Sequence, residues 1–61
     1  MTIYETNYRN RLNEMMTAII QNYGFEHNRT IAFAREVEKR INHPCYQNRE
    51  HMEQLFKGWM K

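Results

Sequence analysis

The residues best able to do chemistry are His43, Cys45 and His51, which offer one thiol and two imidazoles. Thiolates and imidazoles bind zinc, and a thiolate beside an imidazole base can act as a nucleophile. Structural zinc sites, however, take four ligands at spacings such as C-x2-C and H-x3-H, which this chain lacks. We therefore interpret Cys45 as an inert thiol and both histidines as surface residues, and we expect no metal site.

The acidic residues do not form a catalytic pair. The chain has no Asp and no Ser, and all seven acids are Glu. Glu36 and Glu38 lie two positions apart and would point in different directions from a helix, while Glu50 and Glu53 have basic neighbours on the same surface. The two glycines are isolated, so no glycine-rich phosphate loop is present. We predict a protein that is not an enzyme, with no catalytic residues, no cofactor and no small-molecule substrate.

Basic side chains suggest one possible function, the binding of nucleic acid. The cations expected on the second helix are Arg29, Arg35, Lys39 and Arg40. Such cations can bind phosphates, but the net charge is only +2 and Glu residues are interspersed among them. A helix-turn-helix motif is not favoured, because Ile20 is too large and Thr30 is polar at positions where its helices must touch. Nucleic-acid binding through this basic face is the alternative hypothesis.

Apolar side chains suggest the leading hypothesis. One Trp, four Tyr, three Phe and five Met are more than a core of this size needs, and these types are enriched at protein interfaces. The residues expected to contact a partner are Tyr46, Met52, Phe56, Trp59 and Met60. We therefore expect a protein that binds a protein partner or forms a homo-oligomer. Its role would be that of an adaptor, a regulator or an inhibitor, such as mobile elements encode.

These side chains must be positioned by helices, the first of which begins close to residue 1. Thr2 and Glu5 match a capping box, in which each side chain accepts a hydrogen bond from the backbone of the other. Large apolar residues then recur every three or four positions as far as Tyr23. Gly24 stands where helices commonly end, and Phe25 is expected to pack back on the last turn. The first helix is predicted over residues 3–23.

A second helix is predicted over residues 27–42, with Asn28 or a neighbour as its N-cap. Its expected buried face has Phe33 on its flank and consists of Ile31, Ala34, Val37 and Ile41. On the opposite side, Glu36 and Arg40 lie four positions apart and should form an ion pair. The residue before Pro44 is disfavoured in a helix, which ends this element.

The third helix is predicted over residues 45–60, and its start is open between two possibilities. Pro44 could occupy the first helical position, which would place Cys45 on the apolar face, or Asn48 could serve as N-cap. Glu53 and Lys57 are expected to form an outward ion pair. The fold class is thus all-α, a small three-helix bundle in one domain over residues 1–61, with the handedness of the bundle left open.

The length and the single cysteine further limit the class of protein to which the chain can belong. A chain of 61 residues buries only about 60% of the surface that its unfolded form exposes, so the stability should be marginal. One cysteine allows no disulfide within the chain, which favours a reducing compartment. The first residues do not resemble a signal peptide, and no segment reaches membrane-spanning length. We expect a soluble, cytoplasmic protein.

Overall fold

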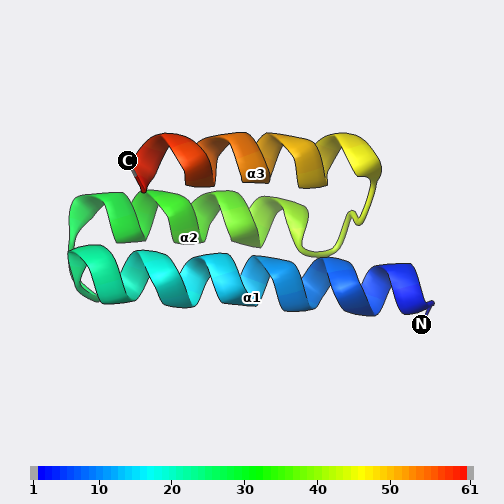
Figure 1. Ribbon diagram of the computed structural model, residues 1–61, viewed down its shortest axis with the longest axis horizontal. Helices are drawn as coiled ribbons and strands as arrows, with labels where there is room; N and C mark the ends of the chain where they lie inside the picture. The colour runs from blue at the N-terminus through cyan, green and yellow to red at the C-terminus, as the bar shows by residue number, and fades with distance from the viewer. Residues whose placement is uncertain (1, 61) are drawn as a thin grey trace.

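The computed structural model describes residues 2–60, which form three α-helices (Figure 1). α1 spans Ile3–Tyr23, α2 spans Asn28–Arg40 and α3 spans Tyr46–Trp59. α1 and α3 run in the same direction, and α2 runs antiparallel to both (Figure 1). The predicted all-α three-helix bundle is confirmed, with each predicted boundary within two residues of the observed one. None of the helices described here is long and apolar enough to cross a membrane.

The capping box at the start of α1 is confirmed. The backbone N–H of Glu5 donates to the Thr2 hydroxyl oxygen at 3.1 Å, and the Glu5 carboxylate accepts from the Thr2 backbone N–H at 3.4 Å. These two bonds satisfy donors that have no partner inside the helix, so the sequence itself defines this helix start.

The end of α1 at Gly24 is also confirmed, but the expected packing of Phe25 is wrong. Gly24 adopts φ +102° and ψ 156°, a conformation open almost only to glycine, and its N–H donates to the Ile20 carbonyl at 2.8 Å. This backbone differs from the left-handed helical cap in which the next residue folds back on the helix. Phe25 instead points outward and is 76% exposed.

The core consists mainly of one stripe of α1. The buried apolar side chains are Tyr8, Leu12, Met15, Ile19, Phe33 and Met52. The first four of these belong to the predicted stripe of α1, which is confirmed at these positions. α2 and α3 contribute one large apolar side chain each, so both helices fold against α1.

The prediction of the buried face of α2 is wrong, because the helix is rotated about its axis relative to the predicted orientation. Ile31 is exposed, whereas Thr30 and Phe33 are buried, and Val37 and Ile41 pack at the edge of the core. The rotation buries the larger ring of Phe33 in place of Ile31. Burial of Thr30 is tolerated because its hydroxyl donates to the Gly24 carbonyl at 2.6 Å.

Two tyrosines of α1 bond to the C-terminal ends of the other helices. The Tyr8 hydroxyl donates to the Arg40 carbonyl of α2 at 2.5 Å, and the Tyr23 hydroxyl donates to the Trp59 carbonyl of α3. Carbonyls in the last turn of a helix have no partner within that helix. These bonds therefore tie both helix ends to α1, and burial is the main cause of the raised pKa of Tyr8.

The start of α3 follows neither predicted alternative. Cys45 is the N-cap, and α3 begins at Tyr46 rather than at Pro44 or after an Asn48 cap. Cys45 is exposed rather than on the apolar face. The Asn48 side chain donates to the His43 carbonyl at 2.8 Å, which fixes the α2–α3 connection to the first turn of α3. The α2 N-cap is His27, the neighbour of Asn28, and its Nδ1 accepts from the Arg29 backbone N–H at 3.0 Å.

Replacing Phe33 with Ala should lower the free energy of unfolding by about 3–5 kcal/mol, because it leaves a cavity in the core. In a domain of this size, such a loss is a large fraction of the total free energy of unfolding. The matched control is Phe25→Ala, which removes the same ring from an exposed site and should change stability by less than about 0.5 kcal/mol. Urea denaturation followed by circular dichroism measures both effects, and equal effects would contradict the assignment of Phe33 to the core.

Replacing each glycine with Ala should have opposite effects on stability. Gly24→Ala forces a side chain into a backbone region that costs about 1–3 kcal/mol. Gly58→Ala should stabilise α3 by about 0.5–1 kcal/mol, because Gly58 lies within the helix and an added Cβ meets nothing within 4 Å. Thermal unfolding of the two variants is the measurement, and a stabilising Gly24→Ala would contradict the observed turn.

Candidate protein-binding surface

The residues considered for metal binding or nucleophilic chemistry lie at the connection between α2 and α3 and on α3. Cys45 and His51 are exposed, and His43 bonds through its backbone to Arg40 and Cys45. Within residues 2–60, no three side chains of His, Cys, Asp or Glu are grouped so that they could hold a metal ion.

The predicted partner-binding residues on α3 divide into two sets. Met52 is fully buried, and its inclusion in a binding surface is wrong because the crossing of α3 over α1 and α2 turns it into the core. Phe56 and Trp59 are half-buried, with ring centroids 6.3 Å and 5.5 Å from that of Phe33. Both rings thus help to hold α3 in the bundle and are only partly exposed to solvent.

Tyr46 and Met60 are the predicted residues that remain accessible. Tyr46 is 72% exposed and Met60 is 37% exposed. They lie at opposite ends of α3, a helix of 14 residues and therefore about 21 Å long. The predicted residues do not form one compact apolar patch.

Polar residues lie between these two ends along one side of α3. A shallow depression on this side is lined by Tyr46, Arg49, Glu50, Glu53, Gln54 and Lys57. We call its exposed members, Tyr46, Glu50, Gln54 and Lys57, the α3 outer face. These positions recur every three or four residues, so they share one side of the helix. The α3 outer face combines one large aromatic ring with one charge of each sign.

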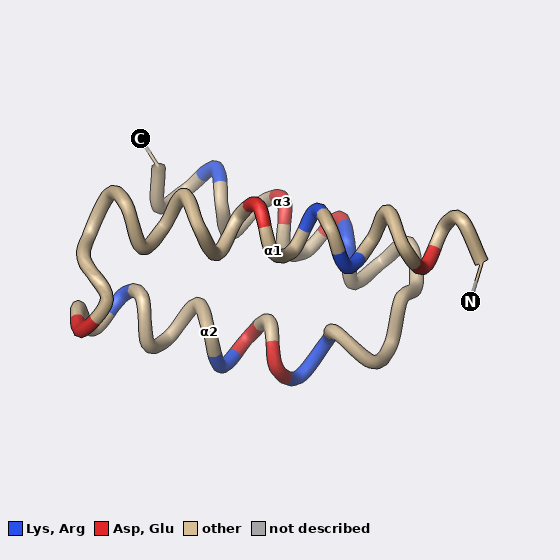
Figure 2. The backbone as a smooth tube through the Cα atoms, turned by 90° about the horizontal axis from the view of Figure 1, so that it is seen from below, with Lys and Arg blue, Asp and Glu red and all other residues tan. Residues whose placement is uncertain are grey.

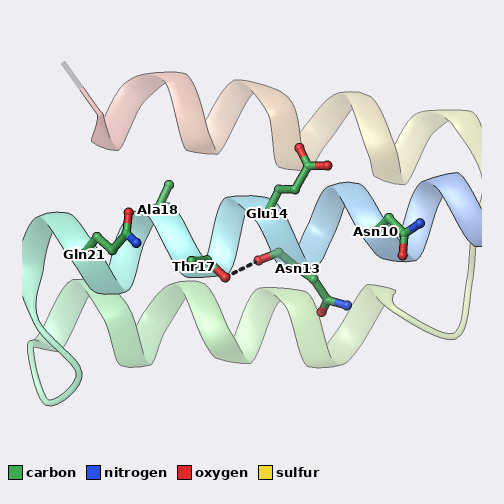
Figure 3. Close-up of a pocket in the computed structure, with 6 residues that line it drawn as sticks. All are labelled: Asn10, Asn13, Glu14, Thr17, Ala18 and Gln21. Carbon is green, nitrogen blue, oxygen red and sulfur yellow. Dashed lines mark hydrogen bonds between the residues drawn. The ribbon is translucent and has the colours of Figure 1, made fainter.

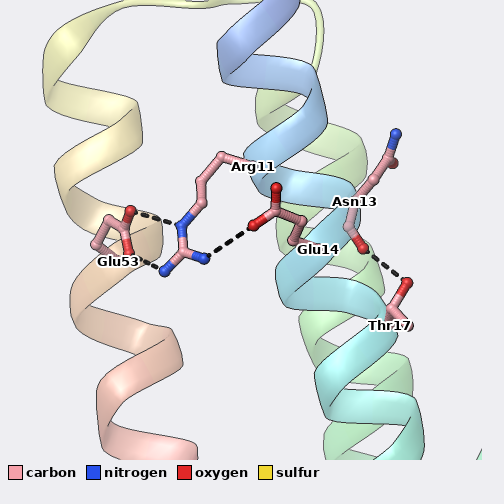
Figure 4. A network of polar contacts seen from close by, with 5 residues as sticks. All are labelled: Arg11, Asn13, Glu14, Thr17 and Glu53. Carbon is pink, nitrogen blue, oxygen red and sulfur yellow. Dashed lines mark hydrogen bonds and ion pairs between the residues drawn. The ribbon is translucent and has the colours of Figure 1, made fainter.

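An ion pair between α1 and α3 lies beside the α3 outer face and holds α3 against α1. The Arg11 guanidinium donates to both carboxylate oxygens of Glu53, at 2.9 Å and 2.8 Å (Figure 4). The guanidinium carbon lies 5.4 Å from the centroid of the Phe56 ring. A third bond of 3.4 Å joins Arg11 to Glu14. The expected outward pair of Glu53 with Lys57 is wrong, because Arg11 holds the carboxylate against α1. The hydrogen bonds from Arg11 lower the pKa of Glu53.

A second depression lies on the outward side of α1. It is open to solvent and lined by Asn10, Asn13, Glu14, Thr17, Ala18 and Gln21 (Figure 3). The Thr17 hydroxyl donates to the Asn13 carbonyl at 2.9 Å, one turn earlier in the same helix. Glu14 is its one charged residue, so this surface lacks the convergent charged groups that fix a ligand in a binding site.

The basic residues of the alternative hypothesis do not form a continuous patch. Arg40 and Lys39 approach the Glu36 carboxylate at 2.9 Å and 3.8 Å, which confirms the predicted pair of Glu36 and Arg40. Arg29 donates to the Tyr23 hydroxyl at 2.9 Å and lies over its ring. Arg35 is exposed. Figure 2 shows charges of both signs interleaved along α2, which weakens the attraction of this surface for a polyanion.

No protein-family model, curated protein or solved structure matches this chain. No relative therefore indicates a functional site, and the candidate site is defined only by the side chains of this chain. Sequence reasoning missed the role of Arg11, since no local pattern links it to a carboxylate 42 positions away. It also missed that Glu50 and Lys57 share the α3 outer face, a relation that their spacing of seven residues could have revealed.

The Arg11–Glu53 pair should make stability depend on pH. The pKa of Glu53 is lowered in the folded protein, so its contribution is complete above the ordinary value of 4.5 and is lost as the pH falls through the lower folded-state pKa. Glu53→Gln should reduce the free energy of unfolding by about 0.5–1 kcal/mol at pH 7. It should also make the further fall of this free energy at acidic pH smaller. Glu26→Gln, at an exposed site on the α1–α2 turn, is the control.

Urea denaturation at pH 7 and at pH 3 measures this effect. The wild-type protein should lose more stability between these two values than Glu53→Gln does. A parallel fall in the two proteins would show that the pair does not stabilise the fold.

Proposed function

We propose that this protein is a non-catalytic helical domain that binds another protein molecule through the α3 outer face. The observation that carries the proposal is the exposure of Tyr46, 72%, on a face that also presents Glu50 and Lys57. Tyrosine is enriched at protein interfaces because its ring provides a large contact area and its hydroxyl a hydrogen bond. Charges of both signs beside it supply a polar rim.

The bonds that tie α3 to α1 support this proposal. Arg11 bonds α3 to α1 at its middle, and the Tyr23 hydroxyl bonds its last turn. A surface that is already ordered loses less conformational entropy on binding. Bound in this way, the domain would act as an adaptor, regulator or inhibitor by occupying a surface of its partner.

A reducing, cytoplasmic environment belongs to the same proposal. Its support is that the chain has a single cysteine, Cys45, whose side chain is exposed. An exposed thiol persists in the reduced form where glutathione and thioredoxin maintain thiols.

A photo-crosslinking amino acid at position 46 tests the binding role in cells that produce the protein. We expect this residue to form a covalent adduct with a protein, and the adduct should survive treatment with nuclease. The matched control places the same amino acid at position 32, since Ala32 is exposed on α2 and away from the α3 outer face. Substitution of Tyr46 by Ala should weaken the captured interaction about tenfold, as expected for an aromatic anchor.

Two results would contradict the proposed role. Equal protein adducts at positions 46 and 32 would show that the α3 outer face has no preference for a partner. A nuclease-sensitive adduct at position 32, with no protein adduct at position 46, would instead favour nucleic acid as the partner, bound through the basic residues of α2.

A further inference from the structure

The α3 outer face has its features arranged in a particular order. Tyr46 lies at its start, Glu50 and Lys57 follow, and Met60 is exposed just after the helix end. Glu50 and Lys57 are seven residues apart, which is two helical turns, so they point to the same side without touching each other. Within residues 2–60, neither side chain forms an ion pair.

This order is complementary to itself when reversed. We propose that the α3 outer face binds the same face of a second copy of this chain, with the two α3 helices antiparallel across a twofold axis. The inference rests on the proposed function and names the partner. In a twofold contact, each residue pair occurs twice, so a small self-complementary surface doubles its interactions.

The charges select one register for the two helices. When Glu50 faces Lys57 of the second copy, Lys57 also faces Glu50 of the second copy, which gives two ion pairs. Glu53 then lies near Gln54 of the second copy, and its own charge is already neutralised by Arg11. A register shifted by one residue would lose both ion pairs and place Arg49 against Lys57, which is repulsive.

The same register brings the separated apolar residues together. It places Tyr46 of each copy at the C-terminal turn of the other, beside the exposed Met60. A thioether near an aromatic ring is a favourable contact. Two apolar residues about 21 Å apart on one chain therefore form two Tyr–Met contacts in the pair, one at each end.

The overall charge also fits a second copy better than a polyanion. The α3 outer face carries one Glu and one Lys, and the protein has a net charge of +2, so two copies repel each other weakly. One helix face is smaller than the roughly 800 Å² per partner of a standard interface. We expect a weak dimer, with a Kd on the order of 100 µM.

Sedimentation equilibrium on the purified full chain at 10 µM to 1 mM tests this pairing. The wild-type protein should pass from monomer to dimer over this range. Glu50→Lys and Lys57→Glu each replace two attractive pairs by two repulsive ones and should each weaken dimerisation about tenfold. Both positions are exposed, and circular dichroism establishes that the variants are folded.

Mixing the two variants gives the sharpest result. A mixed dimer of Glu50→Lys with Lys57→Glu has two attractive pairs again, so the mixture should associate as strongly as the wild-type protein. The control is Glu38→Lys, which makes the same charge change at an exposed site on α2 and should leave dimerisation unchanged.

Three results would overturn the inference: a wild-type monomer at every concentration, a Glu50→Lys dimer as strong as that of wild type, or a mixture that fails to associate. A monomer whose position 46 still crosslinks a different protein would overturn the self-pairing alone. Loss of every protein adduct at position 46 would instead refute the binding role itself.

Discussion

The packing of Phe33 is the interaction on which the rest of this structure depends. Its ring is fully buried among the α1 side chains and lies next to the rings of Phe56 and Trp59 on α3. Of the six fully buried apolar side chains in the described residues, Phe33 is the one that α2 contributes. This contact keeps α2 and α3 on α1, and the Tyr8 and Tyr23 hydroxyls then tie down the ends of both helices.

Local signals in the sequence were sufficient for the helices but not for their rotation. The capping box at Thr2 and the positive φ of Gly24 depend on neighbouring residues only, so both could be predicted. The buried face of α2 could not, because Val37 and Ile41 fit a face with Ile31 as well as one with Phe33. The choice depends on the space that α1 and α3 leave for a large ring, which no local pattern encodes.

In the candidate site, too, local sequence signals predicted some features, while others depend on how the helices pack. The prediction that α3 carries interface residues named Tyr46 and Met60, which are exposed, but also Met52, which the helix crossing buries. Arg11 was overlooked because its carboxylate partner lies on another helix. What the structure adds is the direction of α3: once Arg11 fixes Glu53 against α1, the residues Tyr46, Glu50 and Lys57 face outward together.

The central claim is that this outward face of α3 is a binding surface for a second copy. Amide chemical shifts from two-dimensional NMR over a dilution series test it most directly, because they report every residue separately. The account predicts shifts that change with concentration at Tyr46, Glu50, Gln54 and Lys57, while the exposed positions of α2 stay constant. Shifts that stay constant throughout α3, or changes confined to α2, would contradict it.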